Sequence, residues 1–242
     1  MRTHAFHHAY QQRLSRSTKP FNARGAKVDR CKQCQIAKQY CVCAFQPEAS
    51  DRVSALILLS ENEILKPSNT GRLIADTIRD CHVFQWHRTE PKEKLLAILK
   101  DERYQPIVIF PEEYVEDKQR LFDSSTYQVN PNKRPLLIFL DGSWREARRM
   151  FRKSAYLNGF PVLSIQPDSV SQYLMRKSDK DNHLATAEVA SLVLEQLNFN
   201  QESQSLSEWF GVFRESYLLT KTRNRPNIER PLMQAFVERK QR

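Results

Sequence analysis

The sequence predicts an α/β protein in which helices cover both faces of a mostly parallel sheet. Three observations lead to this prediction. Short apolar runs of strand length alternate along the 242 residues with longer amphipathic patterns that are typical of helices. The runs are continuously apolar, as in strands whose two faces are both buried. The chain contains no repeats and no low-complexity linkers, which favours one large domain with a small N-terminal metal knuckle.

The elements are expected in the following order along the chain. The predicted strands comprise residues 53–59, 83–86, 107–110, 136–140 and 162–165. The predicted helices follow the N-cap residues 68–70, cover 93–99, begin at 144, and cover 185–197 and 206–219. The buried face of the last helix is expected to consist of Leu206, Phe210, Phe213 and Tyr217.

The fourth strand leads into a helix through a very tight turn. Its apolar run ends at Asp141, and Ser143 with Glu146 forms a capping-box pattern, so a helix is expected to begin at Trp144. A carboxylate, a hydroxyl and an indole therefore gather at the carboxyl end of a strand, where open α/β sheets bind their ligands. Taken singly, Ser143 is also explained as a helix cap and Trp144 as a core residue.

Two other helix starts carry polar side chains. Asn69, Thr70 and Arg72 come at the start of the helix after the first strand, where backbone N–H groups and the helix dipole favour a carboxylate or a phosphate. Thr186 and Glu188 come at the start of a later helix. Each group alone is typical of a helix cap, but three such starts together indicate a site.

Four cysteines within thirteen residues have the spacing of metal ligands: Cys31, Cys34, Cys41 and Cys43. Four thiolates predict a tetrahedral zinc site, with an iron–sulfur cluster as the alternative. The site is expected to be structural, because four protein ligands leave no open position for chemistry. Disulfides are disfavoured because the N-terminus does not resemble a secretory signal. The remaining Cys81 is expected to be a small buried hydrophobic residue.

The net charge of +10 is concentrated at the two ends of the chain. Residues 1–30 contain seven Lys/Arg and one Asp, and residues 221–242 contain seven Lys/Arg and two Glu. A near-neutral body with two basic ends is typical of a protein that binds nucleic acid. The basic, aromatic segment 173–177 is suited to RNA. Solubilising tails, or a transit peptide at the N-terminus, are the alternatives.

Several classes of protein are excluded by the sequence. No run of eighteen apolar residues exists, so no membrane association is expected, and the protein is expected in the cytoplasm. Five glycines at scattered positions cannot form a dinucleotide fingerprint or a P-loop. Nothing in the sequence indicates an obligate protein partner.

Taken together, these motifs resemble those of the DTW-domain family. The Asp-x-Thr-Trp motif of the family is met by residues 141–144, and its Ala-Arg-Lys-Met by residues 147–150. Residues 63–73 match its Glu-x-x-Lys-Pro-Ser-Asn-Thr-Gly-Arg-Leu block, and residues 186–190 match Thr-Ala-Glu-Val-Ala. A serine replaces the usual threonine, which keeps the hydroxyl. The resemblance extends over about residues 13–221 and, within the family, points to the bacterial tRNA-uridine aminocarboxypropyltransferases.

This resemblance implies a reaction, a co-substrate and a fold. The 3-amino-3-carboxypropyl group of S-adenosylmethionine passes to N3 of a uridine in the variable-loop region of tRNA, and methylthioadenosine is released. The fold is expected to be SPOUT-like and knotted, an exception to the rule against knots. The expected organisation is a basic arm (1–30), a four-cysteine zinc knuckle (31–50), a DTW catalytic domain (51–220) and a basic tail (221–242).

The resemblance also implies roles for individual residues. Asp141 is expected to contact the uridine N3–H or the donor amino group, and Trp144 to stack on the extruded uracil. Because a helix N-terminus beside Asp141 favours its ionised form, positioning is expected to contribute more than base strength. Donor contacts are expected from Asn69, Thr70, Arg72, Leu140, Ser143, Leu163, Leu184, Thr186 and Glu188. RNA contacts are expected from Arg145, Arg149, Arg176 and Lys177.

Two other functions are compatible with the same motifs. A SPOUT-type RNA methyltransferase would share the donor and the fold but transfer the methyl group, leaving S-adenosylhomocysteine as product. A zinc-knuckle RNA-binding protein with a non-catalytic core would yield no product.

Overall fold

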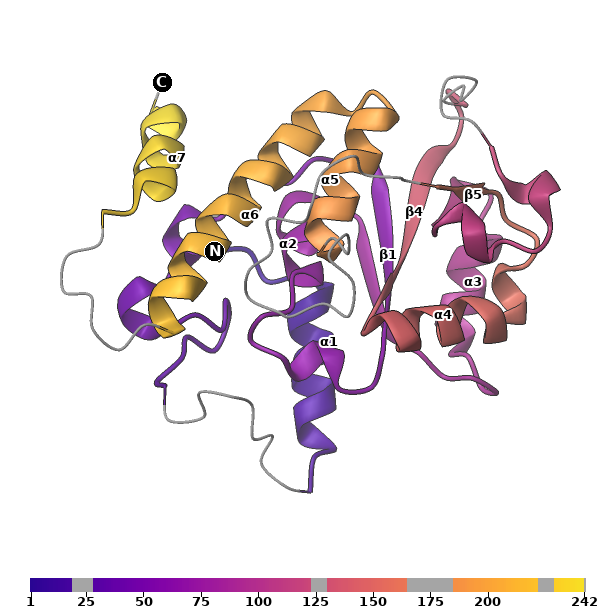
Figure 1. Cartoon of the computed structure of the whole chain (residues 1–242), viewed down its shortest axis with the longest axis horizontal. Coiled ribbons are helices and arrows are strands. Elements are labelled where there is room, and N and C mark those ends of the chain that lie inside the picture. The colour runs from indigo at the N-terminus through magenta and orange to yellow at the C-terminus, as the bar shows by residue number, and fades with distance from the viewer. Residues whose placement is uncertain (19–27, 123–129, 165–184, 222–228, 242) are drawn as a thin grey trace.

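The computed structural model describes residues 1–18, 28–122, 130–164, 185–221 and 229–241. Within these residues, five parallel strands form one sheet in the order β2-β1-β4-β3-β5 (Figure 1). The strands are β1 (Ser54–Leu59), β2 (Cys81–Gln85), β3 (Tyr104–Ile109), β4 (Arg134–Asp141) and β5 (Val162–Leu163). The predicted α/β class with a mostly parallel sheet is therefore confirmed.

Both faces of the sheet are buried under helices. Alternate residues of a strand point to opposite faces. Ala55, Ile57 and Leu59 of β1 pack into the core on one face, and Leu56 and Leu58 pack into the core on the other. The first face carries α1 (Ala5–Ser15), α2 (Gly71–Thr77), α5 (Thr186–Gln196) and α6 (Asn200–Lys221). The second face carries α3 (Glu93–Lys100) and α4 (Trp144–Lys153). This two-sided burial explains why the strands read as continuous apolar runs.

The centre of the sheet is a topological switch point. β1 pairs with β4 in parallel register, with Leu59 opposite Asp141. From β1 the chain continues to β2 on one side, and from β4 it continues to β5 on the other. The Ser60 N–H donates to the Asp141 carbonyl (2.9 Å), which extends the pairing past the strand ends. Open α/β sheets bind ligands at the carboxyl edge of such a point.

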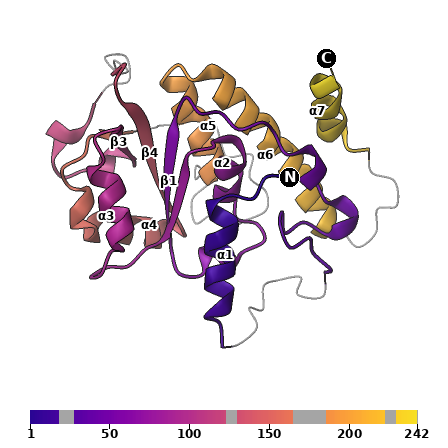
Figure 2. The same cartoon turned by 180° about the vertical axis from the view of Figure 1, so that it is seen from behind.

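Two helices at the ends of the chain were not predicted. The first is α1, of which Phe6 is buried and which lies against β2 and α2 (Figure 2). Its remaining residues form no apolar stripe, so periodicity gave no signal there. The second is α7 (Pro231–Gln241), within the segment expected as a basic tail. Residues 1–30 and 221–242 therefore contain helices that pack on the body.

α7 packs against α6 through specific contacts. The rings of Phe236 and Trp209 lie 5.6 Å apart, and Phe236 is buried. The Glu215 carboxylate accepts from two backbone N–H groups in the first turn of α7. Arg230, just before α7, donates to the Ser216 hydroxyl (2.5 Å). The C-terminal segment is thus basic, and burial and hydrogen bonds also hold it against α6.

A buried carboxylate joins the N-terminal segment to the body. Asp76 of α2 accepts from His4 Nε2 (2.9 Å), Trp209 Nε1 (2.9 Å) and Gln46 Nε2 (2.5 Å). The Arg2 guanidinium donates to the Asp76 carbonyl (3.0 Å). Burial alone would raise the pKa of Asp76, but hydrogen bonds led by His4 outweigh it and lower the pKa. One ionised side chain therefore connects the N-terminus, the segment after the cysteines, α2 and α6.

None of the helices in the described parts of the chain is both long enough and apolar enough to cross a membrane. The expected SPOUT-type knot depends on the path of residues 165–184, which lie outside the described residues. The SPOUT likeness therefore stays a prediction.

We expect Asp76→Asn to lower the free energy of unfolding by about 3 kcal/mol at neutral pH, because one acceptor oxygen is replaced by an NH2 group that faces a buried donor. The folded pKa lies below the ordinary value, so the ionised carboxylate stabilises the fold above about pH 4. This contribution is lost as the pH falls through the folded pKa. Denaturant unfolding of both proteins at pH 7 and pH 3 measures the difference.

The matched control is Asp29→Asn, whose side chain is 75% exposed. It should change the free energy of unfolding by less than about 0.5 kcal/mol. Equal small effects of the two substitutions would show that the Asp76 network does not hold the N-terminal segment.

Candidate functional site at the carboxyl edge of the sheet

Three sequence motifs meet around the side chain of Asp141. Asn69 Nδ2 donates to Asp141 Oδ2 (2.7 Å), and Thr186 Oγ1 donates to Asp141 Oδ1 (2.8 Å). Asp141 is 1% exposed and Asn69 is fully buried, whereas Thr186 is half-buried. The tertiary structure thus brings together residues that are 72 and 45 positions apart in the chain.

The two helices that begin here are joined by a hydrogen bond. The Ala187 N–H at the start of α5 donates to Thr70 Oγ1 beside the start of α2 (3.3 Å).

A Cβ atom at Gly71 would lie 2.5 Å from Asp141 Oδ2 and 3.3 Å from Asn69 Oδ1. A glycine is therefore required, because any side chain would displace the carboxylate or the amide.

A second buried carboxylate belongs to the same network. Glu63 is fully buried, and its Oε1 lies 3.4 Å from the amide nitrogen of Asn69 that also binds Asp141. Lys66 Nζ pairs with Glu63 Oε2 at 2.6 Å. Both residues belong to a motif found in the sequence, but neither was assigned to the site. The spacing Glu-x-x-Lys, with both residues close to Asn69, is the signal that could have identified them.

Arg72 connects this site to the cysteine segment. Its guanidinium donates to the carbonyls of Asn69 (3.1 Å), Lys66 (3.2 Å) and Gln33 (3.4 Å), and it lies 5.4 Å from the centre of the Phe6 ring. It is 4% exposed. Arg72 was expected to bind a donor carboxylate. The structure shows it bonded to the backbone of two segments, the loop of Lys66 and Asn69 and the cysteine segment, and a contact with the donor stays a prediction.

Ser143 begins α4 as the sequence predicted. Its hydroxyl and N–H both donate to the Glu146 carboxylate (2.5 and 2.8 Å), and the Glu146 N–H donates back to Ser143 Oγ (3.4 Å). Burial raises the pKa of Glu146, but the hydrogen bonds from Ser143 outweigh it and lower the pKa. The capping box is confirmed, and it occupies the hydroxyl expected to contact the donor.

Trp144 packs on the opposite face of the sheet from the Asp141 cluster. It is half-buried, stacks on Phe110 at 5.7 Å and meets Tyr114 edge-on at 5.1 Å. Arg148 lies 5.9 Å from the Trp144 ring centre. The packing interpretation of Trp144 thus has direct support, and stacking on a base stays a prediction.

The remaining predicted residues fall into four groups. Leu163 is buried in the core on the Asp141 side of the sheet, and Leu140 is half-buried on the other side. The Glu188 carboxylate accepts from the Ala185 N–H (3.0 Å) and caps α5. Arg145 and Arg149 are exposed on α4, with Arg149 5.6 Å from the Trp86 ring centre. Leu184, Arg176 and Lys177 lie outside the described residues.

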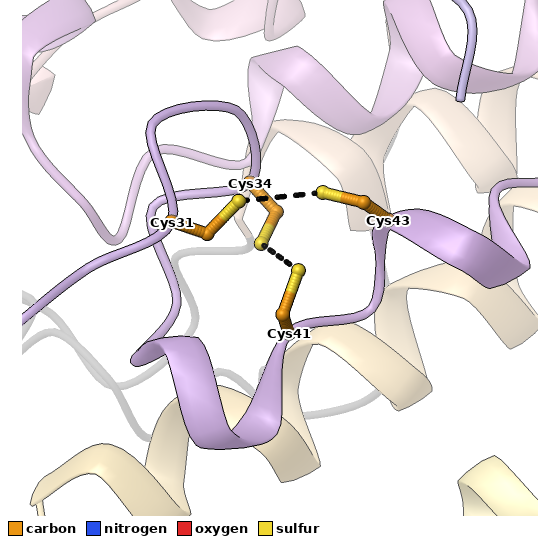
Figure 3. Close-up of side chains that lie close together, drawn as sticks. All are labelled: Cys31, Cys34, Cys41 and Cys43. Carbon is orange, nitrogen blue, oxygen red and sulfur yellow. Dashed lines mark hydrogen bonds between the residues drawn. The ribbon is translucent and has the colours of Figure 1, made fainter.

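The four cysteines form one compact cluster (Figure 3). All four sulfur atoms lie within 4.8 Å of one another, with Cys31 and Cys43 3.5 Å apart and Cys34 and Cys41 3.8 Å apart. A tetrahedral site with Zn–S bonds of about 2.3 Å requires sulfur atoms about 3.8 Å apart. The cluster can therefore hold one metal ion. A polynuclear cluster would insert iron and sulfide among the thiolates and needs wider separations.

The first two cysteines lie in a tight turn from Cys31 to Ile36. The Cys31 N–H donates to the Ile36 carbonyl (2.8 Å), and Gln35 has a positive φ of 62°. A hydrogen bond with Cys43 lowers the pKa of the Cys34 thiol to about 5. The cluster therefore offers at least one thiolate to a metal at neutral pH.

The cysteine segment is part of the main core. Ile36 and Val42 are buried in the same cluster as α5 and α6. The Arg30 guanidinium lies 5.8 Å from the Tyr217 ring centre, and Thr220 accepts from the Ala37 N–H (3.4 Å). A metal at the cysteines would therefore stabilise a segment that packs on α5 and α6.

Comparison with known proteins assigns the family. Residues 28–218 match the model of the DTW domain. The chain belongs to the DTW-domain family. One relative of this DTW protein is tRNA-uridine aminocarboxypropyltransferase 2 of Macaca fascicularis, which is 23% identical over 185 residues. The match covers 72% of this chain and 59% of the relative, so the chain spans less than two thirds of that protein. No solved structure matches.

We expect Gly71→Ala in this DTW protein to weaken binding of S-adenosylmethionine, the implied donor, by roughly tenfold or more. The added Cβ would lie 2.5 Å from Asp141 Oδ2 and must displace it, and displacements of about 1 Å are costly at a preorganised site. Calorimetric titration measures the affinity. Gly159→Ala is the control, because a Cβ there meets nothing within 4 Å. Equal affinities in the two variants would contradict the requirement for glycine.

The cysteine cluster is expected to hold one zinc ion per chain by elemental analysis. Cys34→Ser should abolish the metal and lower the thermal unfolding temperature, because structural zinc binding contributes directly to folding stability. Cys81→Ala should keep the metal, since Cys81 is buried in the core and lies outside the cluster. Iron with sulfide in the purified protein would overturn the assignment of a single zinc ion.

Proposed function

We propose that this DTW-domain protein is a tRNA modification enzyme that transfers the 3-amino-3-carboxypropyl group of S-adenosylmethionine to N3 of a uridine. Family membership and the name of the macaque relative support a tRNA-modifying transferase. The observation that carries the proposal is the buried Asp141 carboxylate, held between Asn69 and Thr186 at the switch point. We place the enzyme with its tRNA substrate in the cytoplasm.

The proposed reaction replaces the S–Cγ bond of the donor with a bond from Cγ to uridine N3. The bond between the sulfonium sulfur and Cγ breaks, and its electron pair leaves with sulfur as neutral methylthioadenosine. Uridine N3 provides the electron pair of the new N–C bond and loses its proton to solvent or to a protein base. The protein must therefore present Cγ, rather than the methyl carbon, to N3 and help the proton to leave.

Asp141 is suited to orienting one of these groups. One of its oxygens accepts from Asn69 and the other from Thr186, so the plane of the carboxylate is fixed. An ionised carboxylate only accepts hydrogen bonds, and the groups to be oriented, N3–H and the donor ammonium group, are both donors. We therefore assign Asp141 to positioning and charge stabilisation ahead of proton abstraction.

The donor carboxylate is assigned to the polar groups around Asn69, Thr70 and the start of α5. The eleven-residue α5 directs its N-terminal dipole toward this point, which favours an anion. Leu163 and the α5 start are assigned to the adenine side. Leu140, Ser143, Glu188 and Leu184 stay proposed donor contacts on the surrounding loops.

The RNA is assigned to the exposed side of α4. This helix begins shortly after the end of β4. It contains five basic residues and one acidic residue, the capping Glu146. Arg145 and Arg149 are proposed to contact phosphates, with Arg176 and Lys177 as further contacts. Trp144 lies next to this surface and is proposed to stack on the uracil.

Zinc at the cysteines is proposed to act as a structural ion. When bound, it would fix the segment that contains Gln33. The Gln33 carbonyl accepts from Arg72, whose other donors hold Lys66 and Asn69. Loss of the metal should therefore disturb the site indirectly. No chemical step requires it, because all four ligands come from the protein.

Asp141→Asn should lower the turnover rate by at least about 100-fold, because the carboxylate is replaced by a neutral amide of the same shape. The affinity for tRNA should change by less than a few-fold, since the side chain is buried away from the basic surface. Transfer of labelled carboxypropyl from S-adenosylmethionine to tRNA gives the rate, and filter binding gives the affinity.

Glu238→Gln, an exposed site on α7, is the control and should keep full activity. Wild-type turnover by Asp141→Asn would remove the residue from the mechanism. Product analysis separates the competing functions: S-adenosylhomocysteine would identify a methyltransferase, and no donor-derived product would leave an RNA-binding protein.

A further inference from the structure

A basic hollow lies at the opposite edge of the sheet from Asp141. It has a volume of about 730 Å³, and twelve residues line it. Five of these are basic and two are acidic, and two asparagines add amide donors. The proposed chemistry at the carboxyl edge uses none of them.

The arrangement of strands explains why these charges gather. A basic residue precedes or begins each of four parallel strands: Arg52 before β1, Arg79 before β2, Arg103 before β3, and Lys133 with Arg134 at the start of β4. The amino ends of parallel strands meet at one edge of a sheet. In Figure 1 this edge is at the top of the sheet, and α4 begins at the other end. Residues far apart in the sequence thus form one patch.

The basic groups remain accessible to a ligand. The side chains of Arg52 and Arg103 are 57% and 78% exposed, and that of Arg79 is 50% exposed. Each pairs with one carboxylate, at 3.4, 2.6 and 2.9 Å respectively. A guanidinium has five N–H donors, so these pairs use only part of each group.

The floor of the hollow is fixed by Asp80. Its Oδ2 accepts from Ser54 (2.6 Å), Tyr104 (2.8 Å) and Arg134 (3.2 Å), and its Oδ1 lies 3.1 Å from His82 Nε2. The Asp80 side chain is 22% exposed. This carboxylate is therefore occupied by the protein, and the five basic residues of the lining outnumber its two acidic residues.

We propose that this hollow, which we name the amino-edge basic hollow, binds the sugar–phosphate backbone of an RNA whose modified uridine lies at the carboxyl edge. The inference rests on the proposed function. The eight residues of β4 span about 26 Å between the two edges. A single nucleotide cannot reach both edges, but a folded RNA can. The lining of the hollow is predominantly polar and positively charged, which suits phosphate rather than an apolar ligand.

The test compares two double variants of the full-length protein. Arg79→Gln with Arg103→Gln removes two exposed cations from the hollow, each paired with one acid that is itself partly exposed. Lys38→Gln with Lys94→Gln is the control: Lys38 is 64% exposed, Lys94 is exposed on α3, and both lie outside the hollow and outside the two basic ends. Both proteins lose the same charge and should unfold at the same temperature.

The hollow variant should weaken tRNA binding by roughly tenfold at about 0.1 M salt. It should also flatten the plot of log affinity against log salt by about 1.4–1.8, because each lost phosphate contact contributes about 0.7–0.9. The KM for tRNA should rise and the turnover rate at saturation should not change. The control should leave the slope unchanged. An unchanged slope in the hollow variant, or an equal change in the control, would overturn the proposal.

A short stem–loop that carries the uridine but cannot extend about 26 Å gives an independent measurement. Wild-type protein and the hollow variant should bind it equally. Equal loss for the stem–loop and the full tRNA would overturn the proposal, since the effect would then not arise at the distant edge. Binding measurements do not require transfer, so absence of activity in the wild type would refute the proposed function and leave this test intact.

Discussion

The parallel pairing of β1 with β4 at the centre of a two-sided core is the constraint on which the rest of the structure depends. It places Leu59 opposite Asp141 and so brings the chain after β1 beside the chain after β4. Because the connections from these strands diverge, the two loops leave an edge that no crossover covers. Asn69 on the loop after β1 can then donate to Asp141 at the end of β4 at 2.7 Å. A change of register by one residue would turn Asp141 to the opposite face.

The site itself is held by buried polar contacts more than by apolar packing. Glu63, Asn69 and Asp141 form a chain in which one amide bridges two carboxylates, and Lys66 neutralises one of them. Arg72 ties the backbone of this loop to the cysteine segment. Partly satisfied buried networks are costly, so these residues act as a unit. This explains why the family block from Glu63 to Arg72 combines acid, base, amide and glycine.

The ends of the chain have two physical roles. Together they carry more than the whole net charge of +10, because the rest of the chain is slightly acidic, yet α1 and α7 are also anchored to the body. His4 and Trp209 converge on Asp76, and Phe236 packs on Trp209. Removing either end would therefore alter the core together with the charge. Point substitutions of exposed cations separate the two effects, whereas truncations combine them.

The sequence by itself determined the features that depend on near neighbours. The strand over 136–140, the capping box of Ser143 and Glu146, and the grouping of four cysteines all follow from spacings of a few residues, and the structure confirms them. Only the tertiary structure decided which polar residues meet. Asn69 and Asp141 are 72 residues apart, and neither their contact nor the carbonyl partners of Arg72 can be recognised from a periodic pattern in the sequence. Such contacts are set by the packing of whole elements. α1 escaped prediction for the same reason: Phe6 packs into a core built by distant elements, His4 before the helix bonds to Asp76, 72 residues away, and the helix itself has no apolar stripe.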